Sequence, residues 1–140
     1  MKYSLFFGII FWVFQSQAQS YHGTWLAYET DGTKKSHLDF YKVNGKLYAK
    51  LVYYYPNKKR GENPVCSKCE GERKNQPIIG MQLTSGLVWN GAEWDGKMLD
   101  PETGKWYKIK IWIDKDNHQK MYVRGYLGVF FETREMFLVK

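Results

Sequence analysis

Gly23-Thr24-Trp25 is the stretch that decides the fold, because it begins a series of extended segments that continues to the end of the chain. From here onward apolar and polar residues alternate. A period of two residues is typical of β-strands whose two faces meet different surroundings. A Gly-x-Trp at the start of the first strand of such a series favours a small antiparallel barrel. A closed barrel acts through its interior or its mouth, so we expect the functional site there.

Turn-forming residues separate the strand-like segments from one another. Asn44-Gly45 suits a two-residue hairpin, because both residues tolerate positive φ. The sequence from Asp100 to Gly104 has the composition of a hairpin loop, which we prefer to a catalytic carboxylate. Segments joined by short hairpins favour an all-β fold, an eight-stranded antiparallel up-and-down barrel without exposed edges. The predicted strands are Trp25–Glu29, His37–Val43, Leu47–Tyr55, Met81–Val88, Trp94–Asp100, Trp106–Ile113, Lys120–Leu127 and Phe131–Val139.

Residues 1–18 have the composition of a signal peptide. Lys2 supplies a positive charge, Leu5–Phe14 form an apolar run, and Ser16-Gln17-Ala18 places small residues where a signal peptidase acts. We therefore expect cleavage after Ala18, a single barrel domain over residues 19–140, and a periplasmic or secreted protein. The alternative is an uncleaved anchor, but the run is about half of the ~20 residues that cross a bilayer. We expect no transmembrane segment after cleavage.

The chain has a formal net charge of +7, which falls to +6 if Lys2 is removed with the signal peptide. A basic protein rich in aromatic residues can bind nucleic acid, an anionic lipid or an acidic small molecule. Export argues against nucleic acid as a partner, and the basic residues are spread over many segments. We prefer the interpretation that they form a solvated surface.

Cys66-Ser67-Lys68-Cys69 contains both cysteines of the chain and lies in the long connection from Pro56 to Gln76. In an exported protein the pattern favours a local disulfide, worth ~2 kcal/mol at most because the ring is short. Thiol redox exchange is a second interpretation, but no helix N-terminus is predicted to stabilise a thiolate. A zinc site would need two further ligands, and this loop holds no histidine. We expect neither a metal nor a cofactor.

Gly23-Thr24-Trp25 together with Arg134 in the last strand resembles the calycin superfamily of lipocalins and fatty-acid-binding proteins. In that superfamily the Trp of the first strand packs beneath the barrel against an Arg of the last. The resemblance therefore implies that Trp25 and Arg134 close one end. A guanidinium stacked on an indole achieves this without leaving a bare charge buried.

Arg124, Tyr126 and Tyr122 share one face of the predicted seventh strand. Fatty-acid-binding proteins use a similar Arg-x-Tyr in a late strand to hold a carboxylate inside the barrel. The resemblance makes these three residues candidate ligand-binding groups. Alternation equally allows them to point outward while Met121, Val123 and Leu127 fill the interior, and we lean towards this arrangement. A barrel filled by its own aromatic side chains is a further alternative.

A closer resemblance covers nearly all of the expected mature chain, and it is carried by several short segments together with Thr133-Arg134. They resemble the exported bacterial family of domain of unknown function 2147, which implies a calycin-like barrel in the envelope or outside the cell and no established activity. Met136-Phe137-Leu138 stands where the family pattern has a Trp, which affects local packing. The other segments are Gly23-Thr24-Trp25, Pro77-Ile78-Ile79-Gly80-Met81, Trp94-Asp95-Gly96-Lys97, Asp100-Pro101-Glu102-Thr103-Gly104-Lys105-Trp106-Tyr107 and Arg124-Gly125-Tyr126-Leu127-Gly128.

Catalytic motifs are missing from the sequence. No His is spaced with Ser or Cys as a nucleophile and base would be, and no Gly-rich phosphate loop is present. We predict no catalytic residues and favour a binding protein for a small apolar or anionic ligand over an enzyme. The alternatives are an envelope interaction module with a disulfide-pinned loop and a thiol redox protein. A cavity beneath the barrel mouth would distinguish the first function from the second.

Overall fold

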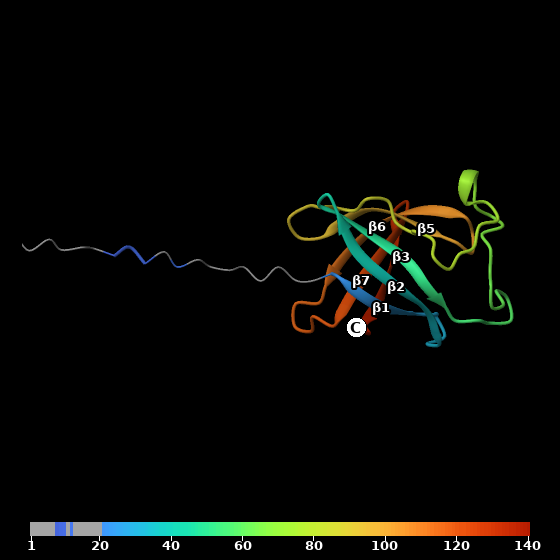
Figure 1. Ribbon diagram of the computed structural model, residues 1–140, viewed down its shortest axis with the longest axis horizontal. Helices are drawn as coiled ribbons and strands as arrows, with labels where there is room; N and C mark the ends of the chain where they lie inside the picture. The colour runs from blue at the N-terminus through green and yellow to red at the C-terminus, as the bar shows by residue number, and fades with distance from the viewer. Residues whose placement is uncertain (1–7, 11, 13–20) are drawn as a thin grey trace, which may run out of the picture.

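The computed structural model describes residues 8–10, 12 and 21–140. The predicted signal peptide and its cleavage site lie largely outside these residues. Within the part of the chain that is described, no helix is long and apolar enough to cross a membrane. From Gly23 onward the chain forms one antiparallel sheet that curls round into a barrel (Figure 1).

The sheet has eight strands, as the alternation of apolar and polar residues predicted. Trp94–Asp100 and Lys120–Leu127 are confirmed to the residue, and most other strands differ from the prediction by a few residues at their ends. The strands are β1 (Gly23–Tyr28), β2 (Lys34–Val43), β3 (Lys46–Tyr54), β4 (Val88–Trp89), β5 (Trp94–Asp100), β6 (Lys105–Ile113), β7 (Lys120–Leu127) and β8 (Phe130–Leu138).

The strand order is β3-β2-β1-β8-β7-β6-β5-β4, so consecutive strands are neighbours wherever a short turn joins them. The first and last strands of the chain pair through three residue pairs that end at Ala27 and Met136. The segment before β4 bridges back to β3 at Leu47–Leu87 and Lys50–Gln82. The barrel is therefore nearly closed, which confirms the predicted up-and-down calycin-like fold.

The predicted strand Met81–Val88 is mostly irregular, and only its last residue belongs to β4. Leu83 and Thr84 are both buried although they are adjacent, so the alternation of a regular strand is broken here. The Thr84 hydroxyl accepts a hydrogen bond from the Ala49 amide at 2.9 Å. The segment also bridges to β5 through Thr84 and Met98. It closes the barrel through these isolated contacts instead of a full ladder.

An aromatic group fills the end of the barrel where β1 begins. Trp25 is fully buried, and its indole N–H donates to the Tyr21 carbonyl at 3.2 Å. The Tyr21 ring packs edge-on against Trp94, with ring centroids 5.8 Å apart. The Lys42 ammonium lies 5.3 Å from the centroid of Trp94. These contacts close this end of the barrel with packed side chains.

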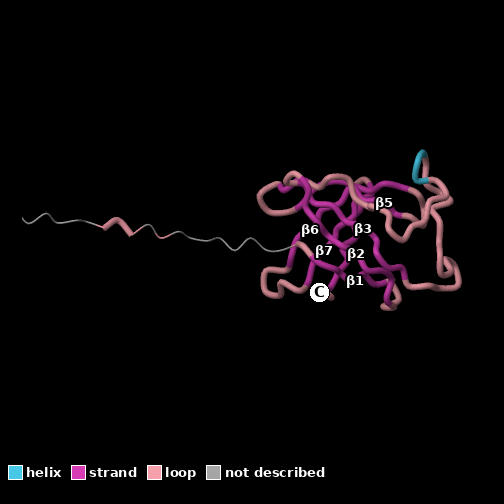
Figure 2. The backbone as a smooth tube through the Cα atoms, in the orientation of Figure 1, coloured by secondary structure: helices cyan, strands magenta, loops and turns pink. Residues whose placement is uncertain are grey.

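The long connection between β3 and β4 lies at the opposite end, and it carries the short 3-10 helix η1 (Gly71–Arg73) (Figure 2). Cys66 and Cys69 form a disulfide in it, which confirms the predicted pairing. The loop packs onto the β5–β6 hairpin, because a Cβ at Gly104 would collide with the Lys68 carbonyl. Gly104 also has φ of 72°, as the predicted hairpin loop requires. The disulfide loop is thus seated against the barrel.

Candidate ligand-binding cavity

A cavity of about 540 Å³ occupies the half of the barrel towards the end of β1. The barrel is therefore not filled by its own side chains, which was one alternative from the sequence. Its walls are mainly apolar and come from seven strands and from the segment before β4. They include Ala27, Leu38, Leu51, Leu83, Met98, Ile109, Val123 and Met136.

Gly125 in β7 keeps part of this space open. It pairs with Ile109 of β6 and with Glu132 of β8, so it occupies an inward position. No heavy atom lies within 4 Å of where its Cβ would stand, and its φ is not in the left-handed region. A side chain at this position would therefore enter the cavity without straining the backbone.

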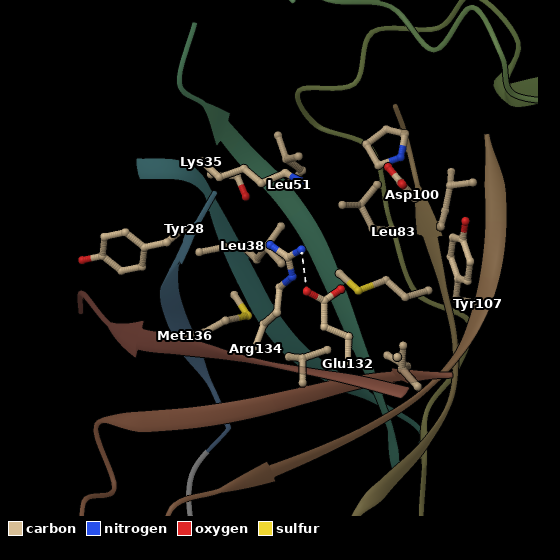
Figure 3. Close-up of a pocket in the computed structure, with 18 of the residues that line it drawn as sticks. Tyr28, Lys35, Leu38, Leu51, Leu83, Asp100, Tyr107, Glu132, Arg134 and Met136 are labelled. Carbon is tan, nitrogen blue, oxygen red and sulfur yellow. Dashed lines mark hydrogen bonds and ion pairs between the residues drawn. The ribbon is translucent and has the colours of Figure 1, made fainter. Parts of the chain in front are cut away.

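Glu132 and Arg134 bring charge into the cavity. They stand two residues apart on β8 and therefore project from the same face of the strand. An Arg134 guanidinium nitrogen (Nη2) lies 3.1 Å from Glu132 Oε1 (Figure 3). The Arg134 side chain is 42% exposed, and the Glu132 side chain is 67% exposed. An ion pair this exposed contributes only about 0–1 kcal/mol, so either partner can exchange it for a ligand at low cost.

The structure does not bring Trp25 and Arg134 together. Leu138 is the residue opposite Trp25, and Arg134 precedes it by four positions on β8. At about 3.3 Å per residue this separation is about 13 Å along the strand. Arg134 therefore lies in the cavity, while Lys42 supplies the cation that stacks on an aromatic ring at the Trp25 end. The expected pairing fails because of the register between β1 and β8.

Tyr122 and Arg124 lie on the outer face of β7. Tyr122 stacks on Trp112 with centroids 5.4 Å apart. The Arg124 guanidinium lies 5.1 Å from the Trp112 centroid and 4.5 Å from that of Phe131. Met121 and Val123 face inward, as preferred from the sequence, but Leu127, which was expected to fill the interior with them, is 68% exposed. Tyr126 reaches the rim of the cavity.

Sequence reasoning missed Glu132 and Arg134 as a cavity pair. Glu132, Arg134 and Met136 follow one another at intervals of two residues, so they project from the same face of β8. Met136 is 3% exposed. Met136 was noted only for family packing, but its burial fixes which face of β8 points inward. That signal was available once an inward position in the last strand was recognised.

A buried arginine ties the long loop to the rim of the cavity. The Arg60 side chain is 7% exposed, and its guanidinium lies 4.0 Å from the ring centroid of Tyr54. It forms ion pairs with Glu29 after β1 and, at 3.1 Å, with Glu102 in the β5–β6 hairpin. It also donates to the Tyr55 carbonyl at 2.7 Å. These contacts join three separate segments around the mouth.

Glu102 makes this rim sensitive to pH. Burial raises its pKa, but the Lys35 charge and hydrogen bonds from Tyr54 and Arg60 outweigh burial, and the net pKa lies below its ordinary value of 4.5. Folding therefore favours the ionised form. This stabilisation is present above the ordinary pKa and is lost as pH falls through the lower folded pKa.

We expect Glu102→Gln to remove part of the acid sensitivity of folding. Wild type should lose stability as pH falls through the folded pKa of Glu102, and the variant should lose less. The effect is modest, because the carboxylate is 48% exposed and partly screened by solvent. Urea unfolding over a series of acid pH values measures it. Glu70→Gln, a change on the exposed surface of the same loop, should follow wild type; equal pH profiles for all three proteins would contradict this role of the rim.

A second hollow lies between β1 and β8, beside the cavity. Backbone pairing of these strands ends at Ala27 and Met136. Beyond that point a hollow of about 360 Å³ lies between them, and it shares Tyr28, Glu132 and Arg134 with the main cavity. Among the described residues, no group of three or more His, Cys, Asp or Glu is placed to hold a metal ion.

Comparison with known proteins agrees with this architecture. A solved structure of protein HP1028 from the human pathogen Helicobacter pylori, which belongs to the lipocalin family, matches with a TM-score of 0.71. The match covers 88% of this chain and 85% of that one at 17% sequence identity, so it shows a shared fold alone. A search of curated proteins finds no match. The family model described as "Uncharacterized protein conserved in bacteria (DUF2147)" matches residues 23–137, and the chain therefore belongs to that bacterial family.

Proposed function

We propose that the protein is an exported binding protein for a small amphipathic molecule. The apolar body of the ligand lies in the cavity, and its anionic group pairs with Arg134. The observation that carries the proposal is a cavity of about 540 Å³ with mainly apolar walls and one arginine directed into it. Cavities of roughly 300–1,000 Å³ with few polar groups are the usual sites for small molecules.

The cavity lining contains Asp100, Glu132 and Glu135 as well as two basic residues, of which Arg134 is the one that can receive an anionic group of the ligand. Glu132 occupies Arg134 in the absence of ligand, and an incoming carboxylate, sulfonate or phosphate replaces it. Lys35 also lines the cavity. The net charge of the exported form, +6 once Lys2 is removed, attracts anions over a longer range. The apolar walls supply the affinity, at roughly 25 cal/mol per Å² of apolar surface removed from water.

Export rests on two further observations. Residues 1–18 have the composition of a signal peptide, and the Cys66–Cys69 disulfide fits an oxidising compartment. The same disulfide does not favour a redox function. Cys66 and Cys69 are 0% and 3% exposed, so a thiol would have to displace the loop to attack either sulfur.

Arg134→Gln is expected to weaken binding of an anionic amphiphile by about tenfold, because a charge-assisted hydrogen bond to the head group is lost. Anilinonaphthalene sulfonate, whose fluorescence rises in apolar surroundings, is the probe, and oleate is the competitor. Titrations compare wild type, Arg134→Gln and the matched control Arg124→Gln, which removes the same charge from the outer face.

The control should bind as wild type does, and an uncharged naphthalene probe should not distinguish the three proteins. Equal affinities of the sulfonate for Arg134→Gln and wild type would show that Arg134 does not hold the anionic group. Absence of any uptake by wild type would reject the binding function itself.

A further inference from the structure

The turn between β7 and β8 presents a cluster of apolar side chains to solvent. Leu127, Val129, Phe130 and Phe131 are 68%, 90%, 75% and 61% exposed. Gly128 has φ of 59°, which suits the first central residue of a two-residue hairpin turn, so the cluster stands on a tight, ordered hairpin. We call these residues, 127–131, the apolar tip. Large apolar side chains gathered at one exposed point mark an interaction site.

The other hairpin turns of the described barrel are polar. Asp31 accepts hydrogen bonds from Thr33, Asn44 and Gly45 form the β2–β3 turn, and Asp114 accepts from two backbone amides in the β6–β7 turn. The fold therefore does not require apolar residues in its turns. The apolar composition of the β7–β8 turn therefore needs an explanation other than folding, and the residues beside the turn indicate one.

Basic and amphipathic residues surround the apolar tip. Arg124 lies beneath Phe131, with its guanidinium 4.5 Å from the ring centroid. Lys108 is opposite Tyr126, and both Lys105 and Trp106 begin β6 at this end of the sheet. A protruding apolar cluster with a collar of Lys, Arg, Trp and Tyr fits the boundary between anionic headgroups and acyl chains. The acidic residues at this end are each matched by a basic one: Glu132 pairs with Arg134, Glu102 pairs with Arg60, and Asp100 lies opposite Lys105.

The apolar tip is also part of the cavity mouth. Leu127, Phe130 and Phe131 line the cavity together with Glu132 and Arg134 of the same hairpin. A surface that covered the tip would therefore lie directly over the entrance.

We propose that the apolar tip inserts into the surface of an anionic lipid bilayer and places the cavity mouth at the membrane boundary. The convex shape of a single hairpin suits a soft lipid layer, and the basic collar is complementary to its negative charge. The insertion does not depend on a ligand in the cavity. The membrane is then a binding partner of the protein in addition to the small amphipathic ligand proposed above.

Sedimentation with lipid vesicles tests this inference on the exported form of the protein, with its disulfide intact and its N-terminus established by mass spectrometry. Wild type should bind vesicles that contain phosphatidylglycerol, bind pure phosphatidylcholine vesicles more weakly, and lose binding at high salt. The double variant V129D/F130D should bind at least about tenfold more weakly, because two apolar side chains no longer enter the lipid. The control V43D/V139D adds the same charge at residues about half exposed near the closed end, and it should bind as wild type does.

Three results would overturn the inference. The first is absence of vesicle binding by wild type, and the second is equal binding by V129D/F130D. The third is a wild-type dimer in solution that V129D/F130D converts to monomer while vesicle binding stays unchanged, since the tip would then join two copies of the chain. Circular dichroism and urea unfolding of V129D/F130D, compared with wild type, show that the variant is folded. Uptake of the soluble sulfonate probe by wild type separates failure of membrane insertion from failure of the proposed binding function.

Discussion

Gly125→Phe should abolish ligand uptake and leave the barrel folded. The phenylalanine ring would enter the cavity from β7, because no heavy atom lies within 4 Å of the new Cβ. The new ring would take the place of part of the ligand, which would then lose contact with the cavity walls. Losing about 1.5–3 kcal/mol of apolar burial lowers the affinity for the ligand by about a hundredfold. Stability should stay equal or rise by about 1 kcal/mol, because glycine is unfavourable inside a strand and the ring fills empty space.

Fluorescence titration with anilinonaphthalene sulfonate measures the loss of uptake, and urea unfolding measures stability. Lys108→Phe adds the same ring to the exposed outer face of β6 and should leave uptake unchanged. If Gly125→Phe binds the probe with wild-type affinity, the probe does not occupy the cavity. If the variant unfolds, the space beside Gly125 is smaller than the structure indicates.

Trp25→Ala is expected to cost about 3–5 kcal/mol of unfolding free energy, the usual range for removing a large buried aromatic side chain. Trp25 is fully buried, and its indole N–H donates to the Tyr21 carbonyl. Domains of this size are stable by only about 5–15 kcal/mol, so much of the stability would be lost. The midpoint of urea unfolding, followed by circular dichroism, measures the effect.

Trp25→Phe is the matched comparison. It keeps most of the buried apolar surface and loses the hydrogen bond to Tyr21, which contributes about 1 kcal/mol. The phenylalanine variant should therefore be much more stable than the alanine variant. A cost below about 1 kcal/mol for Trp25→Ala would mean that Tyr21 and Trp94 hold this end without the indole.

Local patterns predicted the fold well because a strand is encoded by its own alternation. Lys120–Leu127 alternates cleanly and was predicted to the residue. The disulfide was also predictable, since the two cysteines lie only three residues apart and the expected export favoured their pairing. Met81–Val88 was predicted less well. Its burial depends on two flanking strands at once, and Thr84 turns inward to meet the Ala49 amide.

The candidate site was harder to predict, because alternation separates two faces without saying which one is inside. From the sequence Arg124 was a candidate cavity residue, and Arg134 was expected at the closed end beside Trp25. The structure places Arg124 between Trp112 and Phe131 on the outer face and pairs Arg134 with Glu132 in the cavity. One residue of register between neighbouring strands reverses such an assignment.

The sequence by itself determined the strands, their hairpins and the disulfide, since each depends on residues close together in the chain. Only the tertiary structure decided that the barrel is hollow near one end, that Arg134 enters the hollow 13 Å or so from Trp25, and that Gly125 leaves it open. The physical reason is that a cavity is what remains after side chains from eight separated segments have packed. Its volume depends on their register and on the curvature of the sheet, and no single segment carries that information.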